Sequence, residues 1–277
     1  MSASPDLKSI AFNVAGAAVL VVVVGYMIVS YVTTPAVMAC TARYPAGQQF
    51  TLRNSSGHPM SAIELQGRTG SREWGLLKNA KVIGGQAGES LEVKLAATDD
   101  EDLPSQNGVG FVWPIRELTK ANSACLSYYA YLPAGFAFKE AGLLPGLYGA
   151  SDITQIDELQ PEDSFAMRMG WAPNGDVGVE VRAPTRGGYW EAAGRKKIWP
   201  TGRWVRVEQE VALNAPGGED GAMRIWIDGA LTINRTGLTL RKSSLSVLTG
   251  VVADIGYART LSDVAALRFS PFMVQWQ

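Results

Sequence analysis

The chain has 277 residues, of which 47% are hydrophobic, so it is long enough for one large domain or for two small domains beside an anchor. Its 25 basic and 26 acidic residues give a formal net charge of -1, which offers no electrostatic reason to expect nucleic acid as a partner. The one sizeable basic cluster, at residues 195–197, is expected to be a solvated loop.

The first element in chain order is an apolar run at residues 10–32, which contains no charged residue. About 20 apolar residues cross the hydrocarbon core as a helix, so we predict a transmembrane helix over residues 10–34, ended by Pro35. A cleaved signal peptide and a lipoprotein signal at Cys40 are the competing interpretations, although a signal-peptide core has only about 7–15 residues. Because a large domain follows, we place residues 1–9 in the cytoplasm and the C-terminal domain on the periplasmic side of the inner membrane.

The predicted helix offers a candidate surface for packing against other membrane helices. Small residues and one amide share the first half of the run: Ala11, Asn13, Ala15, Gly16 and Ala18. Small side chains let transmembrane helices approach closely, and an amide can hydrogen-bond across such an interface. Small residues are also common in transmembrane helices without this role. Membrane lipid is therefore an expected partner, either alone or together with integral membrane protein subunits.

The two cysteines, Cys40 and Cys125, both follow the predicted helix. A disulfide is permitted on the periplasmic side, where it would tie the segment after the helix to the domain. The sequence does not show that the two Cα atoms come close enough for a bridge. A disulfide, a lipidated Cys40 and free thiols therefore all remain open.

Residues 35–109 contain strand-like pieces, such as residues 90–95, but are harder to interpret. They either supply the opening strands of the following domain or form a small separate module. The acidic run at residues 99–102 is expected to be a solvated loop, because contiguous acids lack the alternating spacing of a loop that wraps a calcium ion. We therefore expect no metal site and no cofactor.

Residues 110–277 break into short strands separated by turn sequences. Val177, Val179 and Val181 alternate with polar residues that include Glu180 and Arg182, a period typical of a strand with one buried face. The turn at residues 172–176 joins this strand to the preceding one as a hairpin. The pattern predicts an all-β sandwich, with short helices only near residues 115–121 and 153–159.

Three stretches of this region resemble the jelly-roll polysaccharide lyases of sequence family 14, which include alginate- and glucuronate-cleaving enzymes. The first covers residues 126–149 and ends in Leu-Pro-Gly-Leu-Tyr-Gly, the second is the hairpin at residues 168–175, and the third covers residues 202–229. Their order and spacing match over about residues 110–275. The resemblance implies an all-β, concanavalin-like jelly-roll β-sandwich at residues 110–277, preceded by the transmembrane helix.

The resemblance also implies a cleft in which catalytic residues are replaced. Such a lyase removes the proton α to a uronate carboxylate, which requires a base and donors that neutralise the carboxylate. By the match, the family's lysine falls at Leu143, its serine at Ala166 and two tyrosines at Glu180 and Arg182, whereas the arginine remains as Arg168. The three charged residues are expected to form a charge ladder across neighbouring strands.

These residues favour a pseudoenzyme: a membrane-anchored, non-catalytic accessory or scaffolding subunit of a bacterial membrane complex. An active, membrane-tethered uronate polysaccharide lyase is the alternative, with Tyr128 or Tyr189 as a displaced base. The third interpretation is a carbohydrate-binding module for an acidic polysaccharide. Its candidate sugar-stacking platforms are Trp190, Trp199 and Trp204.

Overall fold

The computed structural model describes residues 16–17, 19–25, 38–69, 73–85, 88–95, 107–151, 164–184, 187–194, 197–257 and 265–277. The chain divides into two compact units, residues 1–38 and residues 39–277.

In the first unit, residues 16–17 and 19–25 are helical, and the side chains of Val19 to Val24 are all exposed. Within the part of the chain that the structure describes, no helix is both long and apolar enough to span a membrane. Most of the predicted helix at residues 10–34 lies outside the described residues. Of the five predicted packing residues only Gly16 is described, and Ala11, Asn13, Ala15 and Ala18 are not.

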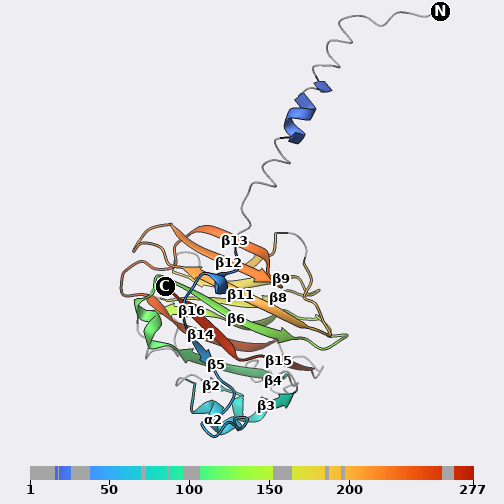
Figure 1. Ribbon diagram of the computed structural model, residues 1–277, viewed down its shortest axis with the longest axis vertical. Coiled ribbons are helices and arrows are strands. Elements are labelled where there is room, and N and C mark those ends of the chain that lie inside the picture. Colours follow the sequence, from blue (N-terminus) through green and yellow to red (C-terminus); the bar gives the residue numbers. More distant parts are fainter. Residues whose placement is uncertain are drawn as a thin grey trace, which may run out of the picture. The chain divides into compact units, whose positions relative to one another are not determined.

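The second unit is a jelly-roll β-sandwich whose described strands form two sheets (Figure 1). The nine-stranded sheet contains β1 (Ala46–Phe50), β3 (Ala80–Gly85), β4 (Gly88–Leu95), β6 (Ser123–Tyr131), β11 (Trp204–Ala212), β12 (Gly221–Ile227), β13 (Ala230–Leu238), β15 (Ala265–Phe269) and β16 (Phe272–Trp276). The seven-stranded sheet contains β2 (Glu73–Trp74), β5 (Gly108–Pro114), β7 (Gly142–Ala150), β8 (Ser164–Trp171), β9 (Val177–Ala183), β10 (Gly187–Ala192) and β14 (Val247–Tyr257). Short helical turns complete the described elements: η1 (Cys40–Ala42), α2 (Ala62–Gln66), α3 (Leu76–Asn79) and η3 (Arg116–Lys120).

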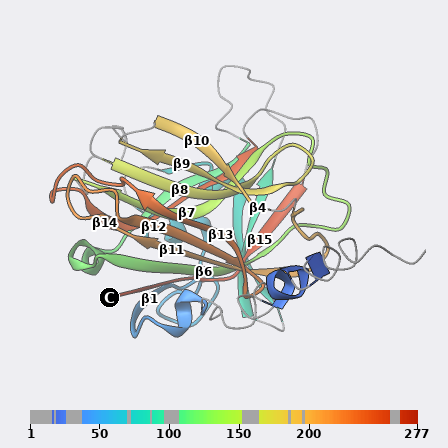
Figure 2. The ribbon, with the colours of Figure 1, turned by 90° about the horizontal axis from the view of Figure 1, so that it is seen from above.

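The core lies between the two sheets, which Figure 2 shows as two layers, with β8 and β9 in one and β6 and β11 in the other. Alternation along each strand explains this arrangement, because every second side chain points to the same face. Val177, Val179 and Val181 are all buried in the core, as the sequence predicted. Glu180 and Arg182 consequently project from the outer face of the seven-stranded sheet.

One buried amide joins the two sheets directly. Gln209 of β11 is fully buried; its Oε1 accepts a hydrogen bond from the Leu147 backbone N–H at 2.7 Å, and its Nε2 donates to the Met167 carbonyl at 2.8 Å. A buried amide is tolerated when its donor and acceptor are both satisfied. Gln209 therefore fixes β11 against β7 and β8, the strands that carry the candidate cleft.

Strands from residues 35–109 belong to the same sandwich. β1 pairs with β16, β4 pairs with β15 and β2 pairs with β5, so the first of the two interpretations of this segment is the one observed. The short helix expected near residues 115–121 is η3, whereas the one expected at residues 153–159 lies outside the described residues.

Candidate functional site

The outer face of the seven-stranded sheet contains a pocket of about 610 Å³. Strands β7 to β10 supply its lining, which includes Leu143, Ala166, Glu180, Arg182, Tyr189 and Trp190. The register explains the convergence: Ala166 pairs with Arg182, and Arg168 pairs with Glu180, on the adjacent strands β8 and β9. Directly paired residues of an antiparallel sheet point to the same face. Four of the five positions that the sequence assigned to the degenerate cleft line this pocket, and the fifth, Arg168, pairs with Glu180 of the lining.

Arg168 lies between two acidic residues, one of which lines the pocket. Its side chain is 5% exposed, and its Nη2 lies 2.5 Å from Glu180 Oε2. Its Nη1 donates to Asp254 Oδ2 of β14. Arg182 adds a second cation, with 3.3 Å between its Nη2 and Glu180 Oε1. The predicted charge ladder is thus present, and Asp254 extends it.

Asp254 was missed by the sequence reasoning. In β14 the core residues Val251, Ala253 and Ile255 alternate with Val252 and Asp254. This period places Asp254 on the outer face, so its orientation could have been predicted. Its contact with Arg168 could not, because 86 residues separate the two and the strand order sets their distance.

Two of the tyrosines proposed as bases differ in their surroundings. Tyr128 faces the core; burial raises its pKa well above the ordinary value, and its hydroxyl donates to the Pro145 carbonyl at 3.0 Å. A phenol held in its neutral form inside the core cannot act as a base. Tyr189 does line the pocket, but it also packs against the core. His58, the single histidine of the sequence, lies in an exposed turn.

The three candidate sugar-stacking tryptophans do not form one surface. Trp190 lines the pocket, where its ring covers Gly178: a Cβ at that position would lie 2.3 Å from the ring. Trp199 is 1% exposed and its indole N–H donates to the Gly170 carbonyl at 2.7 Å, so its prediction as a stacking platform is wrong. Its burial follows from tertiary packing of a segment that has no strand alternation. Trp204 is exposed, but it lies on β11 of the other sheet.

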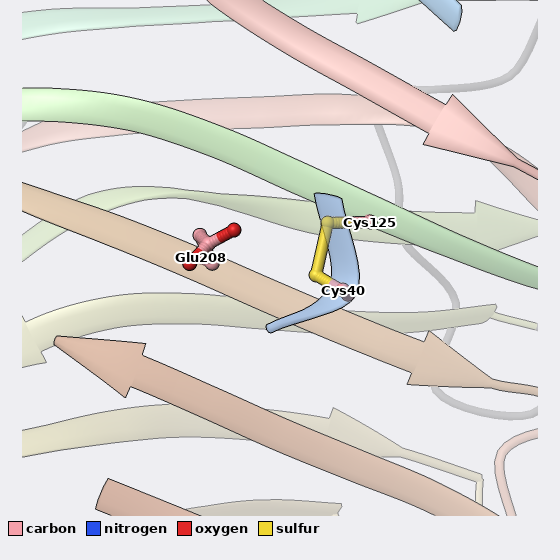
Figure 3. Close-up of side chains that lie close together, drawn as sticks. All are labelled: Cys40, Cys125 and Glu208. Atoms are coloured by element: carbon pink, nitrogen blue, oxygen red, sulfur yellow. A yellow bond between two sulfur atoms is a disulfide. The ribbon is translucent and has the colours of Figure 1, made fainter. Parts of the chain in front are cut away.

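A second polar cluster lies on the outer face of the nine-stranded sheet. Cys40 of η1 and Cys125 of β6 form a disulfide, which leaves neither thiol lipidated or free (Figure 3). Among the described residues, Cys40, Cys125 and Glu208 are the one group with three potential metal ligands close together. Because the two sulfurs are bonded to each other, they offer no thiolate for a metal ion.

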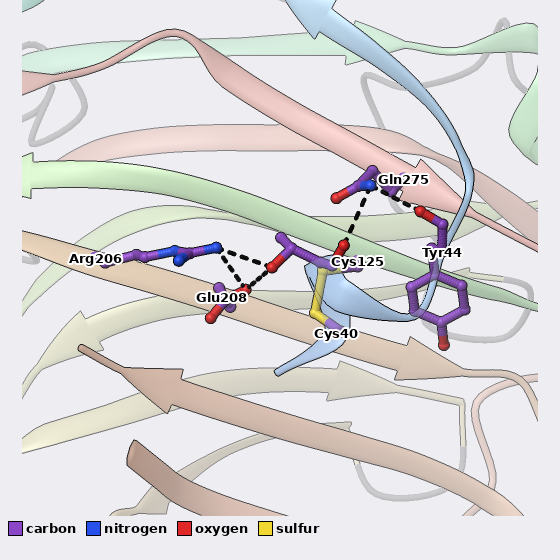
Figure 4. A network of polar contacts seen from close by, with 7 residues as sticks. Cys40, Tyr44, Cys125, Arg206, Glu208 and Gln275 are labelled. Atoms are coloured by element: carbon purple, nitrogen blue, oxygen red, sulfur yellow. Dashed lines mark hydrogen bonds and ion pairs between the residues drawn. A yellow bond between two sulfur atoms is a disulfide. The ribbon is translucent and has the colours of Figure 1, made fainter. Parts of the chain in front are cut away.

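Hydrogen bonds fasten the segment around the disulfide to the same sheet face (Figure 4). Thr41 donates to Glu208, and Arg206 Nη2 donates to Thr41 Oγ1 at 2.8 Å. Gln275 of β16 donates to the Tyr44 carbonyl at 2.7 Å. The chain is therefore fixed from Cys40 onward against the sheet opposite the pocket.

Glu210 is the centre of the remaining contacts of this cluster. It is buried and accepts from Arg43 at 2.6 Å, from the Tyr44 hydroxyl at 2.5 Å and from Arg224 at 2.8 Å. Burial alone would raise the pKa of Glu210, but these three hydrogen bonds outweigh it and lower the pKa below 4.5. Burial and the bond to Glu210 raise the pKa of Tyr44 from 10.0 to about 12.

The family model described as polysaccharide lyase 14 matches residues 85–198 and 180–258. No curated protein matches the chain. Among solved structures, the chain is similar to the PL-14 alginate lyase from Aplysia kurodai, with a TM-score of 0.66 and 17% identity over 83% of this chain and 98% of that one.

Two further structures have similar folds. Alginate lyase Aly36B gives a TM-score of 0.64 at 14% identity, covering 84% of this chain and 97% of that one. Alginate lyase vAL-1 from Chlorella virus gives a TM-score of 0.59 at 13% identity, covering 72% of this chain and 89% of that one. At these identities the likeness shows a shared fold, and function has to be argued from the site.

Proposed function

Because the chain belongs to the polysaccharide lyase 14 family, we propose that it is a membrane-anchored member without lyase activity, which serves as an accessory or scaffolding subunit of a bacterial membrane complex. The observation that carries the proposal is the double pairing of Arg168 with Glu180 and Asp254. A lyase needs cationic or hydrogen-bonding groups free to neutralise the uronate carboxylate as its α-proton leaves. In this chain two internal carboxylates already occupy the guanidinium.

The pocket lining supports the loss of acid–base chemistry. Leu143 stands where the resemblance places a lysine, and an alkyl side chain cannot transfer a proton. Glu180 is engaged within the sheet, because its two oxygens face Arg168 and Arg182. A sugar carboxylate entering beside Glu180 would also meet a like charge. These features favour a family fold retained for a role other than catalysis.

The proposed anchor rests on the apolar run at residues 10–32. The described part of this run is helical, and Val22 is 70% exposed within the chain. Burying apolar surface is favourable by about 25 cal/mol per Å². A helix with exposed valines all along one stretch therefore favours insertion into lipid or contact with another apolar helix.

A second candidate function, binding of an acidic sugar without cleavage, is favoured by one observation. Trp190 and Arg182 both line the pocket, and the side chain of Arg182 is 52% exposed. An aromatic ring and a guanidinium are typical partners for a sugar face and a carboxylate. The missing base does not affect this function.

The proposal is tested by incubating the purified full-length protein with alginate and with glucuronan. No unsaturated, ultraviolet-absorbing product is expected, and Tyr189→Phe serves as the matched variant. Product formed by the wild type and lost in Tyr189→Phe would replace the proposal with an active lyase. Binding without product would favour the sugar-binding function.

A further inference from the structure

An aromatic and cationic surface lies on the outer face of the nine-stranded sheet, away from the pocket. It consists of Tyr129, Tyr131, Trp204, Arg206 and Arg268, which we call the aromatic–arginine surface. The register makes them neighbours: Tyr131 pairs with Trp204 and with Arg268, and Tyr129 pairs with Arg206. Tyr129 is 46% exposed and Trp204 is 40% exposed.

The contacts within this surface leave its outer side open. The rings of Trp204 and Tyr131 have centroids 5.6 Å apart, and the Arg268 guanidinium lies 5.9 Å from the Tyr131 centroid. The side chains of Arg206 and Arg268 are 41% and 45% exposed. Exposed aromatic rings that adjoin guanidinium groups are typical of interfaces rather than of a solvated sheet face.

Positive charge continues from this surface toward the edge of the sheet. Glu92 of β4 bridges Arg268 and Lys81, each at 2.9 Å. A hollow of about 390 Å³ beside this bridge is lined by Glu92 and by Lys78, Lys81 and Lys94. Arg268 and the three lysines outnumber the single acid Glu92, so the patch is net positive. Such a patch is complementary to an anionic partner.

The chain enters the domain on this same face. Cys40 is bonded to Cys125 of β6, and Arg206 of the aromatic–arginine surface donates to Thr41. The segment at Cys40 and Thr41 therefore adjoins the aromatic–arginine surface.

We propose that the aromatic–arginine surface lies against the headgroup layer of an anionic bilayer. Tyrosine and tryptophan rings favour the headgroup zone, and guanidinium groups pair with lipid phosphates through charge-assisted hydrogen bonds. The inference rests on the proposed membrane anchor. Its consequence is that the pocket, on the outer face of the other sheet, opens away from the bilayer.

Site-directed fluorescence on the full-length protein tests this placement. The protein is reconstituted into vesicles of phosphatidylglycerol and phosphatidylcholine, and an environment-sensitive dye is attached to a single introduced cysteine. Among the described residues there is no free cysteine to compete for the dye. Tyr129→Cys reports on the proposed surface, and Leu231→Cys on β13, two strands from β11 in the same sheet, is the second reporter. Arg182→Cys reports on the pocket and Val21→Cys reports on the anchor.

Lipid-borne quenchers are expected to quench the dye at positions 21, 129 and 231. Aqueous iodide is expected to quench the dye at position 182. Replacing phosphatidylglycerol by phosphatidylcholine, or adding Arg268→Gln, is expected to weaken lipid quenching at 129 several-fold and to leave position 21 unchanged. Lipid quenching at position 21 with iodide quenching at positions 129 and 231 would overturn the proposed placement of the aromatic–arginine surface and would support the proposed anchor. Iodide quenching at 21 would overturn both. Protection of 129 from both quenchers only in native membranes would mean that a protein covers the surface, which also overturns the proposal.

Discussion

Arg168 and Glu180 form an ion pair across β8 and β9, with 2.5 Å between Nη2 and Oε2. Asp254 of β14 holds the other side of the same guanidinium. Arg168 and Glu180 are two of the positions at which the family resemblance implies a cleft. The pairing consequently has two measurable effects, one on stability and one on ligand binding.

Removing Arg168 is expected to destabilise the protein strongly. Arg168→Met leaves Glu180 and the buried Asp254 without their shared cation, and breaking a buried pair in this way costs about 3–5 kcal/mol. Arg182→Met is the matched control, because its exposed pair with Glu180 contributes only about 0–1 kcal/mol. Urea unfolding of the full chain in mild detergent, followed by tryptophan fluorescence, measures both. Equal losses for the two variants would contradict the structural role of Arg168.

Neutralising Glu180 is expected to improve the binding of uronate sugars. Glu180→Gln removes a negative charge from the pocket and leaves the second Arg168 contact, with Asp254, in place. Removing one like-charge contact near water is worth about 1 kcal/mol, or roughly fivefold in Kd. Titration calorimetry with an alginate oligosaccharide measures this, and a neutral oligosaccharide is the control. Unchanged affinity would show that Glu180 does not exclude the ligand.

The disulfide is expected to contribute to the stability of the domain. Cys40 and Cys125 are 85 residues apart, and a cross-link over a loop of this length stabilises by about 2–5 kcal/mol. Cys40→Ala with Cys125→Ala should lower the free energy of unfolding by that amount, and reductant should have no further effect on the double variant. A wild type whose unfolding midpoint is the same with and without reductant would refute this prediction.

The Glu210 cluster predicts a stability loss at both ends of the pH range. The folded pKa of Glu210 is depressed below 4.5. Its contribution to stability is therefore present above pH 4.5 and is lost as the pH falls through the folded pKa. The folded pKa of Tyr44 is raised, so its contribution is present below pH 10.0 and is lost as the pH rises toward about 12.

Two variants separate these effects. Tyr44→Phe should remove the part of the alkaline loss that falls between pH 10 and 12, up to about 3 kcal/mol. Glu210→Gln should flatten the acid limb. Unfolding midpoints in urea measured across the pH range provide the test, and an alkaline limb unchanged in Tyr44→Phe would contradict the assignment.

The sequence predicted local geometry well and long-range contacts poorly. Strand alternation placed Glu180 and Arg182 opposite the core valines, and the motif spacing brought Leu143 and Ala166 to the same pocket. The partner of Cys40 was left open, because the pairing depends on a Cα distance of 5.7 Å that only the folded chain determines.

For Trp199 the sequence led to a wrong prediction of exposure. A tryptophan outside a regular strand carries no period from which to read its orientation, and here tertiary packing buries it against Gly170. Asp254 was missed for a related reason, since its contact with Arg168 depends on the order of strands in the sheet. The membrane anchor and its partners stay predictions.

Gentle extraction of native membranes with a mild detergent tests the central claim most directly. The full-length protein is purified by an affinity tag, and the proteins that migrate with it are identified and quantified by mass spectrometry. The account predicts a stoichiometric set of integral membrane proteins, reduced in an Asn13→Leu variant if the helix packs against them. Recovery of the protein only as a free monomer would contradict the scaffolding role.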